Sequence, residues 1–154
     1  MTSANIQRKN IFLNLSLLIA IGLVLSAGLS ATATSSYDIS TIAGNGAASF
    51  GGDSAPATSA MLNGPRSVFL DSARNVYIAD YNNNHIRKIT ASTGVISSIA
   101  GGSVTTTGFA GDNGPAIAAA VRFNNPNSVC VDNFGNFYIA DTTNHRIRMV
   151  IRNC

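Results

Sequence analysis

The side chains that could carry acid–base or metal chemistry are few. The sequence contains two histidines, His85 and His145, seven aspartates and no glutamate. A zinc site needs about three or four protein ligands, which two imidazoles do not supply. A calcium site uses about six to eight oxygen ligands, and the loop pairs Asp53-Ser54 and Asp112-Asn113 offer too few carboxylates. We therefore expect no metal, no cofactor and no catalytic residue, and we expect that the protein is not an enzyme.

Local roles account for the most prominent polar residues. Asp80 and Asp141 each end a β-rich run and are expected to accept hydrogen bonds from backbone N–H groups of the next turn. His145 is expected to pack against Asp141 or a backbone carbonyl. Cys130 lies between two valines and is expected to be a buried thiol; a disulfide with Cys154 is the less favoured alternative, because their strands are not expected to be neighbours.

Basic residues concentrate in two segments near the end of each half of the chain. They are Arg87, Lys88, Arg146, Arg148 and Arg152. Charge on an edge strand discourages aggregation, and we favour that role over an RNA-binding face. The formal charge of +3 includes Arg8 and Lys9, without which about +1 remains. A nearly neutral body has no long-range attraction for nucleic acid, so no nucleic-acid partner is expected.

These residues are positioned by two copies of one sequence unit. The copies share a period of about 60 residues, which indicates an array of repeated structural units. The matched segments are Ile42-Ala43-Gly44 with Ile99-Ala100-Gly101, Phe50 to Asp53 with Phe109 to Asp112, Pro56-Ala57 with Pro115-Ala116, Pro65 with Pro126, and Tyr77 to Asp80 with Tyr138 to Asp141.

Each unit is expected to form a four-stranded antiparallel blade. Ser67 to Leu70 and Val76 to Ala79 predict a hairpin, whose counterpart has Gly135 in its turn where the first unit has Arg74. The turn at Arg74 is therefore expected to be strained or differently shaped. Third strands are predicted at His85 to Thr90 and Arg146 to Arg152, and fourth strands at Val95 to Ala100 and, ahead of the first unit, at Tyr37 to Ala43.

The predicted fold is all-β, a β-propeller segment of two four-stranded blades preceded by a hydrophobic N-terminal helix. The propeller segment covers residues 37–152, with units at about 42–100 and 99–152. Tyr37 to Ala43 is expected to pair beside Arg146 to Arg152 as a clasp between the two ends. Repeat folds need about three or more units, so we expect self-association, with a trimer as the simplest ring, or further repeats.

The segments between blades are expected to be ordered surface loops. They span residues 44–65 and 101–126 and are rich in small and polar residues. Short helical turns are expected near Ala57 to Leu62 and Ala116 to Val121. Phe50 and Phe109 hold the same place in both loops and are expected to tuck into a core.

The first 33 residues predict a targeting segment. Arg8 and Lys9 precede an apolar run that starts at Ile11, and small residues lead to Ala33. This order is typical of a secretory signal peptide cleaved after Ala33. An uncleaved membrane anchor at residues 11–31 is the alternative, since about 20 apolar residues suffice to cross a bilayer. In both cases the body of the protein is expected outside the cytoplasm, as a secreted or membrane-anchored domain.

The repeated motifs resemble the NHL repeat in its extracellular and bacterial form, as in the NHL propeller of teneurins. The residues that carry the resemblance are Asn75, Tyr77, Asp80, Asn136, Tyr138, Asp141, Asn144, His145, Arg146 and Arg148. The first unit departs from the pattern, because Asn83-Asn84-His85 stands where the family has Asn-His-Arg. A shift of one residue moves a side chain to the opposite face of a strand, so His85 is not expected to repeat the contact of His145.

The resemblance implies a function in binding. Propellers of this family mostly present a face to proteins, polysaccharides or RNA, so we expect an exported binding or scaffold module for a protein or carbohydrate ligand. Some relatives are lyases or lactonase-like hydrolases, and a fragment or subunit of such an enzyme is the alternative. Whether the chain is a piece of a longer product stays open.

Overall fold

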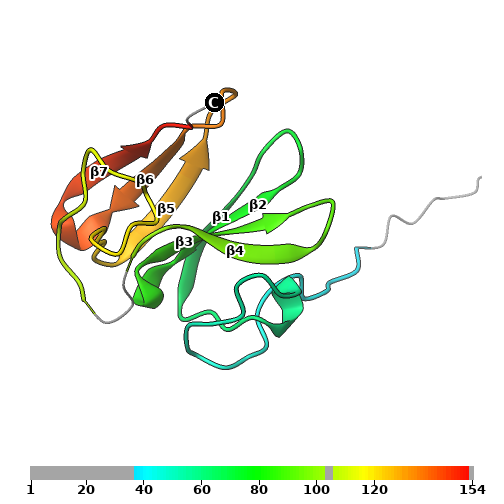
Figure 1. Cartoon of the computed structure of the whole chain (residues 1–154). Helices are drawn as coiled ribbons and strands as arrows, with labels where there is room; N and C mark the ends of the chain where they lie inside the picture. The colour runs from blue at the N-terminus through cyan, green and yellow to red at the C-terminus, as the bar shows by residue number, and fades with distance from the viewer. Residues whose placement is uncertain (1–36, 103–105, 153–154) are drawn as a thin grey trace, which may run out of the picture. The chain divides into compact units, whose positions relative to one another are not determined.

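The computed structural model describes residues 37–102 and 106–152 (Figure 1). The chain divides into two units, Met1–Asp38 and Ile39–Cys154, and the strands found among the described residues lie in the second. The predicted targeting segment and its hydrophobic helix lie outside the described residues. Within the described residues, no helix has both the length and the apolar character needed to span a membrane.

Two antiparallel sheets form the second unit, and in both the strands follow one another in sequence order. The first sheet comprises β1 (Pro65–Leu70), β2 (Val76–Asp80), β3 (His85–Thr90) and β4 (Val95–Ala100); the second comprises β5 (Pro126–Val131), β6 (Phe137–Asp141) and β7 (Arg146–Val150). The all-β architecture and the order of these seven strands agree with the prediction.

The second sheet has three strands, not four, among the described residues. The predicted strand at Tyr37 to Ala43 is absent, and the side chain of Ile39 is 100% exposed. The predicted clasp with β7 is therefore wrong for this structure. The physical reason is that Gly44 N–H donates to Ala57 O at 2.9 Å, which holds the end of this segment against the first blade, away from β7 (Figure 1).

The two sheets pack face to face around one apolar core. Alternate residues of a strand point to opposite faces, so Tyr77, Ala79 and Ile86 of the first sheet lie on the face that meets Val129 and Ile139 of the second. The residues between them point the other way. Ile78, Ile89 and Ile96 form a second cluster with Ala57 and Ala60 of the preceding loop.

The β1–β2 turn and the β5–β6 turn have the same shape. Arg74 has φ +64° and its N–H donates to Asp71 O at 2.9 Å, whereas Gly135 has φ +86° and its N–H donates to Asp132 O at 3.0 Å. The left-handed conformation is costly for a residue with a Cβ atom. Of the two outcomes expected for the first turn, the strained turn is the one observed.

The described parts of the inter-blade loops are residues 44–65, 101–102 and 106–126. The first contains the 3-10 turn η1 (Ala57–Ser59), as expected. The corresponding part of the second, from Ala116 to Val121, forms turns without a helix. Two further 3-10 turns, η2 (Tyr81–Asn83) and η3 (Thr142–Asn144), connect the second and third strands of each blade.

We expect exchange of the two hairpin-turn residues to have opposite effects on stability. A left-handed conformation costs a non-glycine residue about 1–2 kcal/mol, and glycine loses about 0.5–1 kcal/mol through backbone entropy. Arg74→Gly should therefore raise the free energy of unfolding by about 0.5–1 kcal/mol, and Gly135→Arg should lower it by a similar amount. Urea unfolding measures both; equal effects of the same sign would contradict the assignment.

Candidate functional site: a repeated aspartate and arginine cluster

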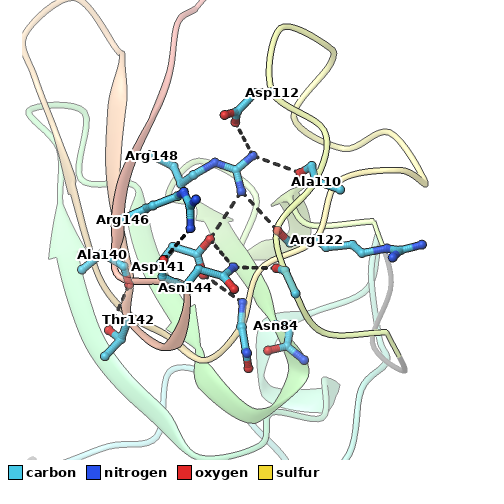
Figure 2. Close-up of polar contacts among 12 residues, drawn as sticks. Asn84, Ala110, Asp112, Arg122, Ala140, Asp141, Thr142, Asn144, Arg146 and Arg148 are labelled. Atoms are coloured by element: carbon cyan, nitrogen blue, oxygen red, sulfur yellow. Dashed lines mark hydrogen bonds and ion pairs between the residues drawn. The ribbon is translucent and has the colours of Figure 1, made fainter.

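Asp141 is the centre of a polar cluster in the second blade (Figure 2). It ends β6 with its side chain fully buried. Its carboxylate accepts hydrogen bonds from Asn124 N–H at 2.8 Å, from Asn144 Nδ2 at 2.8 Å and from Arg148 Nη1 at 3.4 Å. The carboxylate thus receives three hydrogen bonds, one of them from a cation, so this buried charge is compensated.

Arg148 connects the sheet to the loop that precedes it. From β7 its guanidinium donates to Arg122 O and Ala110 O, both at 3.1 Å, and forms an ion pair of 2.6 Å with Asp112. Figure 2 shows the group reaching across to these loop atoms. A planar guanidinium can serve several acceptors at once, which an ammonium on a flexible stem does less well.

The first blade repeats the central carboxylate contacts. Asp80 is fully buried and accepts hydrogen bonds from Asn63 N–H at 2.8 Å, from Asn83 Nδ2 at 2.8 Å and from Arg87 Nη1 at 3.2 Å. Each donor holds the repeat position of its counterpart around Asp141.

The arginine contacts are repeated as well. Arg87 is 0% exposed, donates to Gly51 O and Met61 O, and pairs with Asp53 at 2.7 Å. Its Nε is the one guanidinium atom without a partner among the described residues. The cluster is therefore a property of the repeat and not of one blade.

This geometry corrects two expectations and gives Asp53 and Asp112 a role. The backbone N–H groups that bind Asp80 and Asp141 come from the preceding loop, 17 residues upstream, and not from the next turn. Arg87 lies in β3, an interior strand, and is buried, so the edge-strand role is wrong for it. Asp53 and Asp112 are ion-pair partners of the arginines.

Phe50 and Phe109 cover the arginines instead of entering the apolar core. The ring of Phe50 lies 4.9 Å from Arg87 Cζ, and that of Phe109 lies 4.9 Å from Arg148 Cζ and 4.0 Å from Arg146 Cζ. Phe109 is 43% exposed. The expectation of core insertion is thus wrong, and the shared position reflects cation–π contact with the guanidinium groups.

The one-residue shift of the histidine is confirmed by strand register. His85 pairs with Asp80 as Arg146 pairs with Asp141. His85 is buried against Phe50, with ring centroids 4.6 Å apart, and its Nδ1 lies 2.7 Å from Asn83 O. Burial lowers the pKa of His85 below 6.5, and the nearby Arg87 adds to this effect.

His145 takes the position of Asn84. Both end a 3-10 turn in the left-handed conformation, with φ of 55° and 57°. The side chain of His145 is exposed and has no hydrogen-bond partner among the described residues, so the expected contact with Asp141 or a carbonyl is wrong. The left-handed turn carries this side chain out into solvent.

The remaining motif residues organise the hairpin turns. Asn75 donates through its N–H and Nδ2 to Asp71, each at 2.8 Å, and Tyr77 Oη donates to the same carboxylate at 3.2 Å. Although burial raises the pKa of Asp71, these hydrogen bonds outweigh it and the pKa lies below 3.8. Burial and the Asp71 charge raise the pKa of Tyr77 to about 12.

The second turn has the same arrangement. Asn136 donates to Asp132 through its N–H and its Nδ2, both at 2.9 Å, and Tyr138 Oη donates to this carboxylate at 3.3 Å. The hydrogen bond from the Asn136 side chain is the main cause that lowers the pKa of Asp132. The asparagine, tyrosine and turn aspartate of the motif thus form one local structure.

A family model for the teneurin NHL domain matches residues 54–151. The chain belongs to the teneurin NHL domain family. The match covers both sheets and includes the central pairs Asp80 with Arg87 and Asp141 with Arg148. No curated protein shows significant similarity to the chain.

Solved structures of similar fold include proteins from Bacteroides. An auxiliary nutrient binding protein from Bacteroides thetaiotaomicron is 26% identical with a TM-score of 0.57, and the match covers 70% of this chain and 27% of that protein. An auxiliary nutrient binding protein from Bacteroides ovatus is 26% identical with a TM-score of 0.52, covering 66% and 26%. The NHL chain therefore spans about a quarter of the length of these proteins.

The buried aspartates and arginines of both blades are engaged in structural contacts. Across residues 37–102 and 106–152, no group of three or more His, Cys or Asp side chains is placed to hold a metal ion. Cys130, expected to be buried, is exposed on β5, because its side chain points away from the core that Val129 enters. Cys154 lies outside the described residues.

Some members of the cluster were missed at the level of sequence. Asn83, Met61 and Gly51 contribute a side-chain amide and two carbonyls to the first cluster. Their repeat positions were visible in the sequence, but a backbone carbonyl has no residue-type signal. Only the fold shows that these loop atoms meet the guanidinium.

We expect the two ion pairs of Arg87 to differ strongly in their contribution. Arg87→Met should lower the free energy of unfolding by about 3–5 kcal/mol, because it leaves the buried Asp80 charge without its counter-ion. Asp53→Asn should cost less than about 1 kcal/mol, because Asp53 is 38% exposed and solvent screens its pair. Guanidinium chloride unfolding measures both, and comparable losses would refute the assigned burial effect.

We expect stability to decline below pH 6.5 through His85. Because its pKa is lowered in the folded state, the unfolded chain binds the proton first as the pH falls, and the fold loses stability from pH 6.5 down to the folded pKa. The urea midpoint should therefore be lower at about pH 5.5 than at about pH 7.5. His85→Gln should weaken this dependence, whereas His145→Gln, an exposed control, should retain it.

Proposed function

We propose that this NHL chain is an exported binding or scaffold module whose ligand is a carbohydrate or a protein. The observation that carries the proposal is the use of the motif side chains. In both blades the buried aspartate and arginine hold the loop to the sheet, and the motif tyrosine and asparagine hold the hairpin turn. Because these groups are engaged in structural contacts, we assign ligand recognition to the exposed residues around them.

One end of the first blade offers suitable recognition groups. The η2 turn places Tyr81 under the guanidinium of Arg66, whose Cζ lies 4.2 Å from the ring centroid. Asn82 is exposed beside it and donates through Nδ2 to Asn63 Oδ1 at 3.1 Å. Amides and a guanidinium beside an aromatic ring suit the hydroxyl groups and apolar faces of sugars.

The second blade has a similar polar end. Thr142 and Thr143 of η3 are exposed, and Thr143 Oγ1 donates to Asn125 Oδ1 at 3.4 Å. The auxiliary nutrient binding proteins to which the chain is similar support a role in binding. Export is supported by the order of charged, apolar and small residues before Ala33.

A glycan array probed with the full-length chain tests the carbohydrate arm. We expect selective binding that Asn82→Ala weakens about tenfold, the effect of losing about 1.4 kcal/mol of hydrogen bonding. Phe134→Ala is the control, because Phe134 is 83% exposed on a β-hairpin turn and lies outside this recognition surface.

The remaining outcomes separate the alternatives. Binding to no glycan, with an extracellular protein captured by crosslinking on intact cells and lost with Asn82→Ala, would assign a protein ligand. Failure of both arms, or retention of the chain in the cytoplasm on fractionation, would overturn the proposal.

A further inference from the structure

The second sheet has an open edge at β7 where the first sheet has its fourth strand. In the first blade, β4 is held from two sides. It pairs with β3 along one edge, with Ile96 opposite Ile89. On the other edge, Ser54 N–H donates to Ile96 O at 2.8 Å and Ile96 N–H donates to Ala55 O at 3.1 Å. A strand placed in this way has both backbone edges satisfied.

The loop before the second sheet has backbone groups that correspond to those holding β4 in the first blade. Asn113 corresponds to Ser54, and both have φ +64°. The Asn113 N–H and the Gly114 carbonyl, counterparts of the groups that bind Ile96, have no hydrogen-bond partner among the described residues. Between this loop and β7 lies a groove of about 750 Å³, lined by residues that include Pro115, Arg148 and Val150.

A segment of the chain matches the missing strand. Residues 39–44 read Ile-Ser-Thr-Ile-Ala-Gly, and residues 96–101, which form most of β4 and the glycine after it, read Ile-Ser-Ser-Ile-Ala-Gly. The connections that follow are also alike. Gly44 N–H donates to Ala57 O at 2.9 Å, as Gly101 N–H donates to Ala116 O at 2.9 Å.

This repetition fixes where the matching segment belongs. Ala100 ends β4 of one blade and packs into the core shared with the next blade. Ala43, its counterpart, packs against the Ile78 cluster of the first blade. Ile39 to Ala43 therefore lead away from the first blade into the position of a preceding blade, and not toward β7 of the same chain.

The exposed outer faces of the two sheets correspond to the two faces that meet between the blades of one chain. Ile86 and Val129 are buried where the two blades of one chain meet, at 0% and 3% exposure. Their counterparts at the open faces are Ile147, 73% exposed on the second sheet, and Val68, 66% exposed on the first. Large exposed apolar residues on two matching faces are typical of a contact surface.

We propose that Ile39–Ala43 of one copy completes the second sheet of another copy, so that the chains assemble head to tail. The second blade of the acceptor then packs on the first blade of the donor through Ile147 and Val68, as the two blades of one chain pack through Ile86 and Val129. Such a heterologous contact forms a ring when the rotation between copies closes, and a ring of three copies would carry six sheets. The assembly goes beyond the proposed binding function and does not depend on the ligand.

The register of the donated strand follows from the repeat. Ile39 takes the place of Ile96 and lies opposite Val150, because Val150 is the counterpart of Ile89. Its backbone N–H donates to Gly114 O and its carbonyl accepts from Asn113 N–H. Ser40 lies opposite Met149 with its side chain on the other face.

Crosslinking between two differently tagged full-length chains tests the proposal. In a background of Cys130→Ser and Cys154→Ser, one chain carries Ile39→Cys and the other Val150→Cys. After co-expression and mild oxidation, we expect a disulfide-linked heterodimer on non-reducing gels, because directly opposed residues of neighbouring strands lie within disulfide reach.

A matched control uses Ser40→Cys in place of Ile39→Cys. This shifts the thiol to the other face of the strand, and we expect about tenfold less crosslinked product. A chain carrying both Ile39→Cys and Val150→Cys separates the two topologies, because assembly in trans gives linked dimers and higher species. An internal link without dimers, equal crosslinking of the two registers, or no crosslink from chains with the far-ultraviolet circular dichroism of the parent would overturn the proposal.

Discussion

The contact on which each blade depends is the ion pair between a strand-ending aspartate and the arginine seven residues further along the chain, in the next strand. Asp80 with Arg87, and Asp141 with Arg148, join neighbouring strands and carry the preceding loop with them. Charges taken out of water are costly unless every partner is present. Those partners are the loop carbonyls, the asparagine side chain and the second aspartate. If the loop moved away from the sheet, buried charges would lose these partners.

The aromatic residue of each loop completes this arrangement. Phe50 and Phe109 lie over the guanidinium groups, and in the first blade His85 fills the place that Arg146 takes in the second. A neutral imidazole packs against the ring of Phe50 where Arg146 stacks as a cation on Phe109. The same backbone frame thus accepts two different side chains.

The incomplete second sheet links the fold to the proposed assembly. A strand edge and an apolar blade face are both satisfied by another blade of the same kind. Each blade of this fold has surfaces for a neighbouring blade on both sides. The groove beside β7 and the exposed side chains of Val68 and Ile147 both follow from this. The proposed binding and the proposed assembly therefore involve different parts of the blade: polar turns at its end, and apolar faces along its sheet.

The sequence alone determined the strands, their order and the NHL family. The signals were the repeat, the alternation of apolar residues and the turn-forming residues, which are local patterns with a fixed period. Only the tertiary structure decided what surrounds each polar side chain. The burial of Arg87, the exposure of Cys130 and His145, and the failure of Ile39 to Ala43 to form a strand within its own chain all depend on which distant backbone groups come close. A strand needs a partner edge and a buried charge needs its donors, and both are contributed by residues far away in the sequence.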